Sequence, residues 1–134
     1  MTTVPVSHWT KKVNSLLDVS DPVWKAWRAM KEDQVKILPV ASNNKIVGVV
    51  SAKDIVRASD HNGGQSMSVK EAMSLDPLIV HHNNSLVEVA QSMIKKDQQH
   101  AIVTFDNDES IGIFSWSEAV LFFLKHNNVG LAIS

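Results

Sequence analysis

The chain has 134 residues, of which 44% are hydrophobic and 20% charged, with 13 Lys and Arg, 14 Asp and Glu and no Cys. This composition is typical of a globular protein, and the missing cysteine excludes disulfides, thiolate metal sites and cysteine nucleophiles. The net charge of −1 offers no basic excess for nucleic acid or anionic lipid. No apolar stretch reaches the ~18 residues that span a bilayer, and no signal-peptide pattern opens the chain. We therefore expect a cytoplasmic protein without nucleic-acid or membrane partners.

Two halves of the chain repeat one sequence pattern. Residues 33–40 align with residues 97–104, and the alignment continues without a gap to further matched positions: Asn43 with Asn107, Gly48 with Gly112, and Ser51 with Ser115. A repeat of this length indicates that the unit of folding occurs twice.

The repeat predicts the domain organisation. We expect a first repeat over residues 1–60, a Gly-rich polar linker over 61–68 and a second repeat over 69–134. A unit of about 60 residues buries only about 60% of its unfolded surface and is marginal alone. We therefore expect the two halves to pack as one pseudo-two-fold module.

Each half predicts the element order strand, helix, strand, strand, helix. In the first half these elements are expected near 16–17, from Asp21-Pro22 onward, and at 37–40, 46–50 and 52–58. In the second half they are expected at 78–80, from Ser85 onward, and at 101–105, 111–114 and 116–125. Turns rich in Asn and Asp at 42–44 and 106–108 indicate that the paired strands form hairpins. The predicted fold class is therefore α/β (α+β), with two β-α-β-β-α repeats.

Helix starts and lead-in segments complete this prediction. Asp21 is expected to cap the first helix, with Pro22 at its first position, and Ser85 with Glu88 matches a capping box. Residues 68–73 predict a short helix leading into the second half, and residues 5–10 are expected to play that part in the first half. On the first long helix, Trp27 is assigned to the apolar core face.

Ser51 and Asp54 stand where a hairpin ends and a helix begins, and Ser115 and Glu118 occupy the equivalent positions. Such a Ser with an acid three residues later is a capping box, which needs no ligand. The same helix start could instead bind a phosphate through its N–H groups, while the acid accepts hydrogen bonds from ribose hydroxyls. Gly48 would permit close approach of the backbone. Both interpretations fit the spacing.

The repeat, the element order and these signatures resemble a tandem pair of cystathionine β-synthase (CBS) domains, called a Bateman module. The resemblance covers roughly residues 6–126, and its main stretches are Ile37-Leu38-Pro39-Val40, residues 47–55 and residues 69–78. It implies a non-catalytic regulatory module that needs no cofactor. Such a module binds AMP, ADP, ATP or S-adenosylmethionine in clefts between its halves.

The resemblance also implies specific ligand contacts in the first half. The family's Gly-x-x-Ser/Thr-x-x-Asp signature, which contacts phosphate and ribose, falls on Gly48, Ser51 and Asp54. Adenine contacts would come from apolar residues of two strands: Leu16, Leu17, Ile37, Leu38 and Pro39. Lys36 would reach the phosphate.

The second half departs from the family pattern. Glu118 replaces the Asp of the signature, Trp116 adds a bulky ring, and His100 stands at the position equivalent to Lys36. An added methylene displaces the carboxylate by about one C–C bond, which disturbs a bidentate contact with ribose. We therefore expect one good site in the first half and a weaker or altered site at Ser115 and Glu118.

Two further features bear on partners. His81-His82 could suggest a metal site, but neighbouring residues on a strand point to opposite faces and no other ligand stands at metal-binding spacing. We therefore expect a solvated strand end and no metal. Residues 120–124 are apolar on all sides of a helix. Since modules of this family commonly pair through helices, we expect a homodimer through this segment, with a helix buried inside the monomer as the alternative.

Two functional hypotheses follow. The first is a small-molecule sensor that binds an adenosyl ligand and regulates a protein that the sequence leaves unnamed. The second is a protein-assembly module whose ligand clefts are vestigial. No enzyme is expected, because paired carboxylates and a Walker-type lysine loop are absent and Ser51 has no His at a known activating spacing.

Overall fold

The computed structural model describes residues 3–60, 64–106 and 110–126. Linker residues 61–63 and turn residues 107–108 lie outside the described residues. The chain divides into two compact units: unit 1 comprises Met1–Lys12 and Leu78–Ser134, and unit 2 comprises Val13–Pro77. No helix in the described ranges is long and apolar enough to cross a bilayer.

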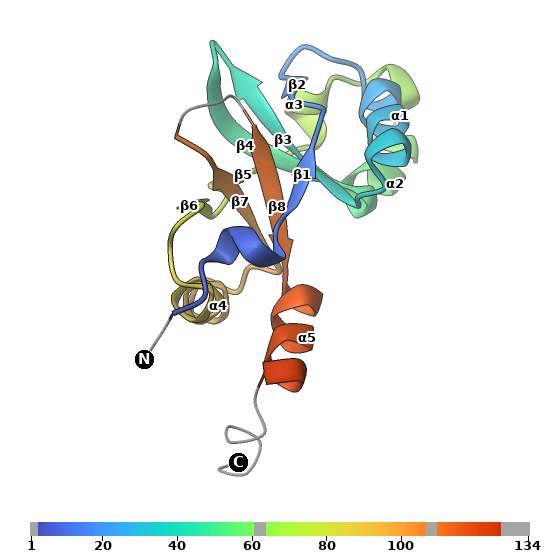
Figure 1. Ribbon diagram of the computed structural model, residues 1–134. Coiled ribbons are helices and arrows are strands. Elements are labelled where there is room, and N and C mark those ends of the chain that lie inside the picture. Colours follow the sequence, from blue (N-terminus) through green and yellow to red (C-terminus); the bar gives the residue numbers. More distant parts are fainter. Residues whose placement is uncertain (1–2, 61–63, 107–109, 127–134) are drawn as a thin grey trace. The chain divides into compact units, whose positions relative to one another are not determined.

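Unit 2 contains a four-stranded sheet in the order β2-β3-β4-β5, with three helices (Figure 1). Its strands are β2 (Leu17–Asp18), β3 (Ile37–Ser42), β4 (Lys45–Ser51) and β5 (Ser74–Leu75), and its helices are α1 (Val23–Asp33), α2 (Ala52–Ser59) and α3 (Val69–Ala72). Strand β2 is parallel to β3, whereas β4 is antiparallel to both of its neighbours. Asn43 and Asn44 have φ angles of 51° and 65°, as a tight hairpin turn requires.

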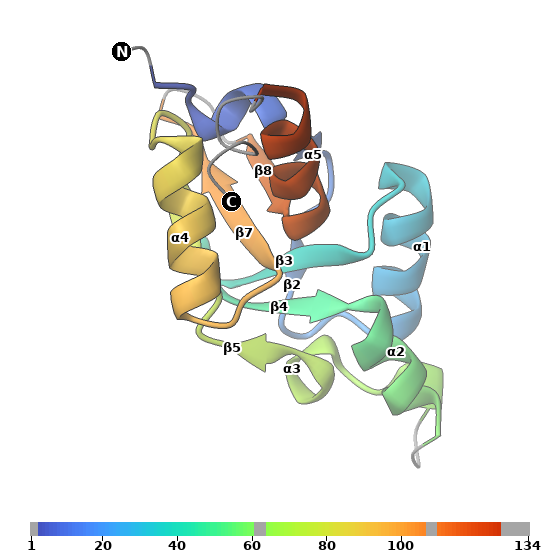
Figure 2. The ribbon, with the colours of Figure 1, turned by 90° about the horizontal axis from the view of Figure 1, so that it is seen from below.

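Unit 1 repeats this plan with a sheet in the order β1-β8-β7-β6. Its strands are β1 (Lys11–Val13), β6 (Ile79–His81), β7 (His100–Thr104) and β8 (Ile111–Ser115), and its helices are α4 (Leu86–Lys95) and α5 (Trp116–His126). The boundary between the units falls within β1, whose last residue, Val13, belongs to unit 2. Within each unit two long helices lie against the sheet (Figure 2). The predicted mixed α+β class and the repeated β-α-β-β-α order are confirmed. A short fourth strand in each sheet, β5 or β1, was not predicted.

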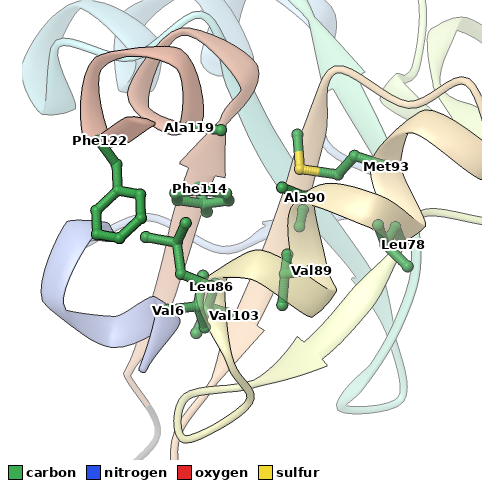
Figure 3. Close-up of a cluster of buried hydrophobic side chains, with 11 residues drawn as sticks. Val6, Leu78, Leu86, Val89, Ala90, Met93, Val103, Phe114, Ala119 and Phe122 are labelled. Atoms are coloured by element: carbon green, nitrogen blue, oxygen red, sulfur yellow. The ribbon is translucent and has the colours of Figure 1, made fainter. Parts of the chain in front are cut away.

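The core of unit 1 forms where α4, α5, the sheet and the 3-10 turn η1 (Val6–Trp9) meet. Figure 3 shows these side chains converging in one cluster, which includes Val6, Leu86, Met93, Phe114 and Phe122. Val6 and Leu86 are completely buried, and Phe114 of β8 is the largest fully buried side chain. The buried residues of α4 recur at helical spacing, so one apolar face holds this helix in the core: Leu86, Val89, Ala90 and Met93.

The two short lead-in segments, residues 5–10 and 68–73, each pack against the half opposite to the one predicted. The turn η1 contacts α4, α5 and β8 of unit 1, whereas α3 contacts α1 and α2 of unit 2. Backbone hydrogen bonds explain this: Val6 donates to Asn84 (2.8 Å) and Val69 donates to Asp21 (2.7 Å), at the loop before the first long helix of each unit. The assignment of residues 5–10 to the first half is thus wrong. That the first repeat ends at residue 60 and the second begins at residue 69 stays a prediction.

Two expectations about α1 are also wrong. Its N-cap is Pro22, with no side-chain capping bond, because Asp21 instead accepts the Asp18 N–H (2.9 Å) and pairs with Lys25 (3.2 Å). Trp27 is 50% exposed, since the buried face is formed by other residues of the helix: Val23, Ala26, Ala29 and Met30. The Lys31 ammonium lies 5.7 Å from the centre of the Trp27 ring.

Candidate functional site

Ser51 ends β4 and caps α2, so the start of the helix is fixed by the sheet. Its Oγ accepts the Asp54 N–H (3.2 Å), and Asp54 Oδ2 accepts the Ser51 N–H (2.8 Å), which completes the predicted capping box. Asp54 is 5% exposed and is the one buried charged residue among those described. Its Oδ1 pairs with the Arg57 guanidinium at 3.3 Å.

Strand pairing brings two more predicted residues to this helix start. The carbonyl of Lys36 accepts the Ala52 N–H (2.8 Å), and Ile37 lies opposite Ser51 in the antiparallel ladder. Lys36 is exposed and Ile37 is buried. The structure therefore places Lys36, Ile37, Ser51 and Asp54 together at one end of the β3–β4 hairpin.

The first turn of α2 retains little free hydrogen-bonding capacity. The N–H groups of Ser51, Ala52 and Asp54 all have protein acceptors. Across the described ranges, only the Lys53 N–H of this turn lacks one. An anion here would therefore meet one backbone donor, the positive end of the helix dipole and the exposed Lys53 side chain.

Asp54 lines a hollow of about 220 Å³ between α2, α3 and the segment before α3. The other lining residues are Arg57, Ala58, Met67, Glu71 and Ala72. Small-molecule pockets usually measure ~300–1,000 Å³, so this hollow fits part of a nucleotide rather than all of it. Sequence reasoning missed Met67 and Glu71 because Met67 lies in the predicted linker and Glu71 beyond it, so both reach α2 only through the fold. The spacing of Asp54 and Arg57, in contrast, is typical of a helical ion pair.

The apolar residues expected to contact adenine do not share this hollow. Leu17 and Leu38 are 2% and 0% exposed and belong to the core of unit 2, and Pro39 is also buried. Leu16 is 48% exposed and, with Leu17, lines a separate hollow of about 420 Å³ beside α1. Contacts from Leu17 and Leu38 to a ligand would therefore need their backbone groups.

Gly48 has a structural role that the sequence did not reveal. A Cβ at this position would lie 2.6 Å from the Ser74 carbonyl oxygen of β5 and 2.9 Å from Met73 Sδ. At the equivalent Gly112 of β8, a Cβ would collide with Thr10 Cγ2 and lie 3.3 Å from the Lys11 oxygen. Both glycines therefore admit the short fourth strand, which accounts for them without a ligand.

The second half has an incomplete version of the same helix start. Ser115 Oγ accepts the Glu118 N–H (3.3 Å) and also bonds Ser117 Oγ (2.9 Å). No bond from the Glu118 carboxylate to the Ser115 N–H is found in the described part of the chain. Trp116 lines a hollow of about 210 Å³. His100 lies opposite Ser115, and burial lowers the pKa of its imidazole.

A third group of polar side chains lies in unit 1, at the ends of β6 and β7. The His81 and His82 ring centroids are 4.4 Å apart, and the Asp106 carboxylate contacts both imidazoles. The hydrogen bond to Asp106 raises the pKa of His81 and lowers that of Asp106. The expectation of opposite faces fails because β6 ends at His81, and alternation applies only within a strand.

The sequence matches the CBS domain family over residues 10–61 and 69–125. Because these ranges cover most of the chain and coincide with the two repeats, the chain belongs to the CBS domain family, and the resemblance is confirmed.

Curated relatives are longer proteins. The uncharacterized protein MJ1232 of Methanocaldococcus jannaschii is 29% identical over 84 residues, which are 63% of this chain and 27% of that protein. An inosine-5'-monophosphate dehydrogenase of Korarchaeum cryptofilum is 32% identical over 93 residues, 69% of this chain and 19% of that protein. The chain thus matches about a quarter or less of each relative's length.

Solved structures share the fold. The CBS domain pair of protein MJ0100, solved with 5'-methylthioadenosine and S-adenosyl-L-methionine, has a TM-score of 0.77 at 19% identity and covers 92% of this chain and 98% of that one. CBSX2 in complex with AMP has a TM-score of 0.69 at 22% identity, covering 90% and 96%. At these identities the likeness establishes the fold of a CBS pair.

Proposed function

We propose that this chain is a non-catalytic regulatory module that binds an adenosyl ligand, with the ribose and phosphate held at the start of α2. The observation that carries the proposal is the placement of the buried Asp54 carboxylate at the head of α2, facing a hollow. The fold supports it, since two solved CBS pairs of the same fold contain AMP or S-adenosyl-L-methionine.

The ribose contact requires spare capacity on Asp54. Its Oδ2 stabilises the cap, while its Oδ1 pairs with Arg57, whose side chain is 67% exposed. An ion pair with so exposed a partner contributes at most about 1 kcal/mol. A carboxylate oxygen also has two lone pairs. A ribose hydroxyl can therefore donate to Oδ1 at little cost, with or without displacement of Arg57.

The phosphate contact falls on the first turn of α2. The Lys53 N–H and the helix dipole supply local positive potential, and two exposed lysines add to it: Lys53 lies in this turn, and the Lys36 backbone is hydrogen-bonded to Ala52. This local charge suits a protein whose net charge is only −1. Adenine would be held by the backbone of β2 and β3 and by the exposed Leu16.

Ligand binding would regulate by changing the population of a conformation or contact. A coupling free energy of about 1–3 kcal/mol between ligand and output is enough. The output would be a partner protein or a second copy of this chain. The altered Ser115 and Glu118 pair would form a weaker site, or none.

The assembly module remains the second candidate, and one observation favours it. The box of Ser51 and Asp54 is already satisfied by protein groups, so these residues have a stabilising role without a ligand. An exposed apolar stripe on α5, formed by Val120, Leu121 and Leu124, would then be the working surface. We propose that this stripe forms a homodimer in either case.

A thermal-shift panel distinguishes the two candidates. AMP, ADP, ATP, S-adenosylmethionine and NAD are each added to the full chain at about 2 mM, because the stabilisation grows with the ratio of ligand concentration to Kd. A ligand at 100 times its Kd stabilises by about 2.7 kcal/mol, or about 5–10 °C for a domain of this size. The sensor predicts such a shift for at least one adenosyl compound and none for inorganic phosphate. No shift with any compound would support the assembly module instead.

A further inference from the structure

Two backbone connections bring the ends of β6 and β7 together in unit 1. His82 follows directly after β6 and donates its N–H to the Thr104 carbonyl (2.9 Å), the last residue of β7. Asp106 lies two residues beyond Thr104. This pairing explains how a carboxylate remote in sequence reaches two adjacent histidines.

The three side chains lie close enough together to share one metal ion. One ligand atom from each of His81, His82 and Asp106 lies within 4.8 Å of the others. His82 Nε2 is 3.5 Å from Asp106 Oδ2. Two ligand atoms bound to one zinc at about 2.0–2.1 Å and a tetrahedral angle lie about 3.4 Å apart. The His81 Nε2 contact with Asp106 Oδ1 is shorter, so a metal ion would replace that hydrogen bond.

Neighbouring groups orient both imidazoles. Asn83 Oδ1 accepts the Nδ1 proton of His81, and Asp106 accepts the Nε2 proton, so a metal ion would take the place of the Nε2 proton while Asn83 still holds the ring. The His81 backbone N–H donates to Asn84 Oδ1 (2.9 Å), which holds the turn. The His82 ring stacks on Phe105 with centroids 5.1 Å apart and an interplanar angle of 11°. Each histidine therefore has a support of its own.

We propose that His81, His82 and Asp106 form a binding site for a divalent transition-metal ion such as Zn²⁺. Two imidazoles and one carboxylate suit zinc, cobalt, nickel or copper better than magnesium or calcium, which prefer oxygen ligands. The side chains are 34%, 30% and 57% exposed, so an ion has access and a coordination position stays open. This site lies in unit 1 and is independent of the ligand site proposed at α2.

Isothermal titration of the full, EDTA-stripped and dialysed chain with ZnCl2 tests the proposal. One saturable Zn²⁺ site per chain is expected, and MgCl2 should give none. His81→Ala and the near-isosteric Asp106→Asn should each abolish it. Asn83→Ala, which alters only the supporting bond, should weaken Zn²⁺ affinity by about 10- to 100-fold.

His8→Ala is the matched control, because His8 is an exposed histidine of the same unit outside the cluster. It should bind Zn²⁺ as the unaltered chain does. Circular dichroism in EDTA verifies that each variant is folded, and Asp106→Asn preserves the shape of the site if His81→Ala does not fold. Absence of saturable binding, or undiminished binding by both His81→Ala and Asp106→Asn, would overturn the proposal.

Discussion

Position 112 requires glycine because Thr10, which is distant in the sequence, occupies the space that a Cβ would need. A Cβ on residue 112 would collide with the Thr10 methyl group, whose hydroxyl donates to the Val6 carbonyl (2.7 Å). The obstacle is one methyl group, with the Lys11 oxygen next at 3.3 Å. At Gly48, in contrast, the obstacle is the backbone of β5.

Removal of that methyl group should therefore rescue a substitution at Gly112. We expect Gly112→Ala to lower the free energy of unfolding by about 1–3 kcal/mol through overpacking. Thr10→Ser keeps the hydroxyl donor, so the double variant should recover much of the loss. A double-mutant cycle by urea denaturation measures this coupling. Additive effects of the two substitutions would contradict the contact.

His100 should make stability depend on pH. Burial lowers its pKa in the folded chain below the ordinary value of 6.5, so the unfolded chain takes up the proton first as the pH falls. The free energy of unfolding should then decrease below about pH 6.5, until the folded His100 also titrates. Urea denaturation at several pH values should show a shallower decrease for His100→Gln. Equal slopes would show that His100 does not contribute.

At the scale of elements, the two helix starts differ in how the acid is used. The Asp54 carboxylate accepts the Ser51 N–H from a buried position, whereas Glu118 has no such bond among the described contacts. Asp54→Ala should therefore lower the free energy of unfolding by about 1–3 kcal/mol, and Glu118→Ala by no more than about 0.5 kcal/mol. Denaturant titrations measure the free energy of unfolding of both variants. Equal decreases would contradict the proposed difference between the two helix starts.

Local sequence patterns predicted most of the helices and strands. The two short strands that form only through pairing with distant residues were not predicted. Hairpins and long helices follow from apolar period and turn residues, and the box at Ser51 and Asp54 lies within one helical turn. Strands β1 and β5 have three and two residues and form only by pairing with β8 and β4. No local pattern marks such short strands.

The candidate site divides in the same way. Ser51 and Asp54 could be predicted because capping is local, whereas Met67 in the predicted linker and Glu71 beyond it reach α2 only through the fold. Asp106 lies beside His81 and His82 because β6 and β7 pair. The spacing of these residues along the sequence does not indicate that pairing. The prediction of Asp21 as a helix cap was wrong because its carboxylate accepts the Asp18 backbone N–H instead.

At the scale of the whole molecule, α5 offers a test of self-association. Leu124 is 56% exposed on this helix, and Ile94 is 65% exposed on α4. If α5 pairs two copies, Leu124→Asp should convert a dimer to a monomer, while the control Ile94→Asp should not. Light scattering after size exclusion reports the mass of each. If the unaltered chain is itself a monomer, the proposed homodimer through α5 is wrong.

The most direct test of adenosyl binding is AMP affinity with and without the Asp54 charge. Asp54→Asn keeps an oxygen for the Ser51 N–H but removes the charge that a ribose hydroxyl would meet. Calorimetric titration should show that AMP binds the unaltered chain, and that Asp54→Asn weakens AMP by about 10- to 150-fold, or about 1.5–3 kcal/mol. The control Glu118→Gln should leave AMP affinity nearly unchanged. Undetectable AMP binding at millimolar concentration, or equal affinity in Asp54→Asn, would contradict the proposed site.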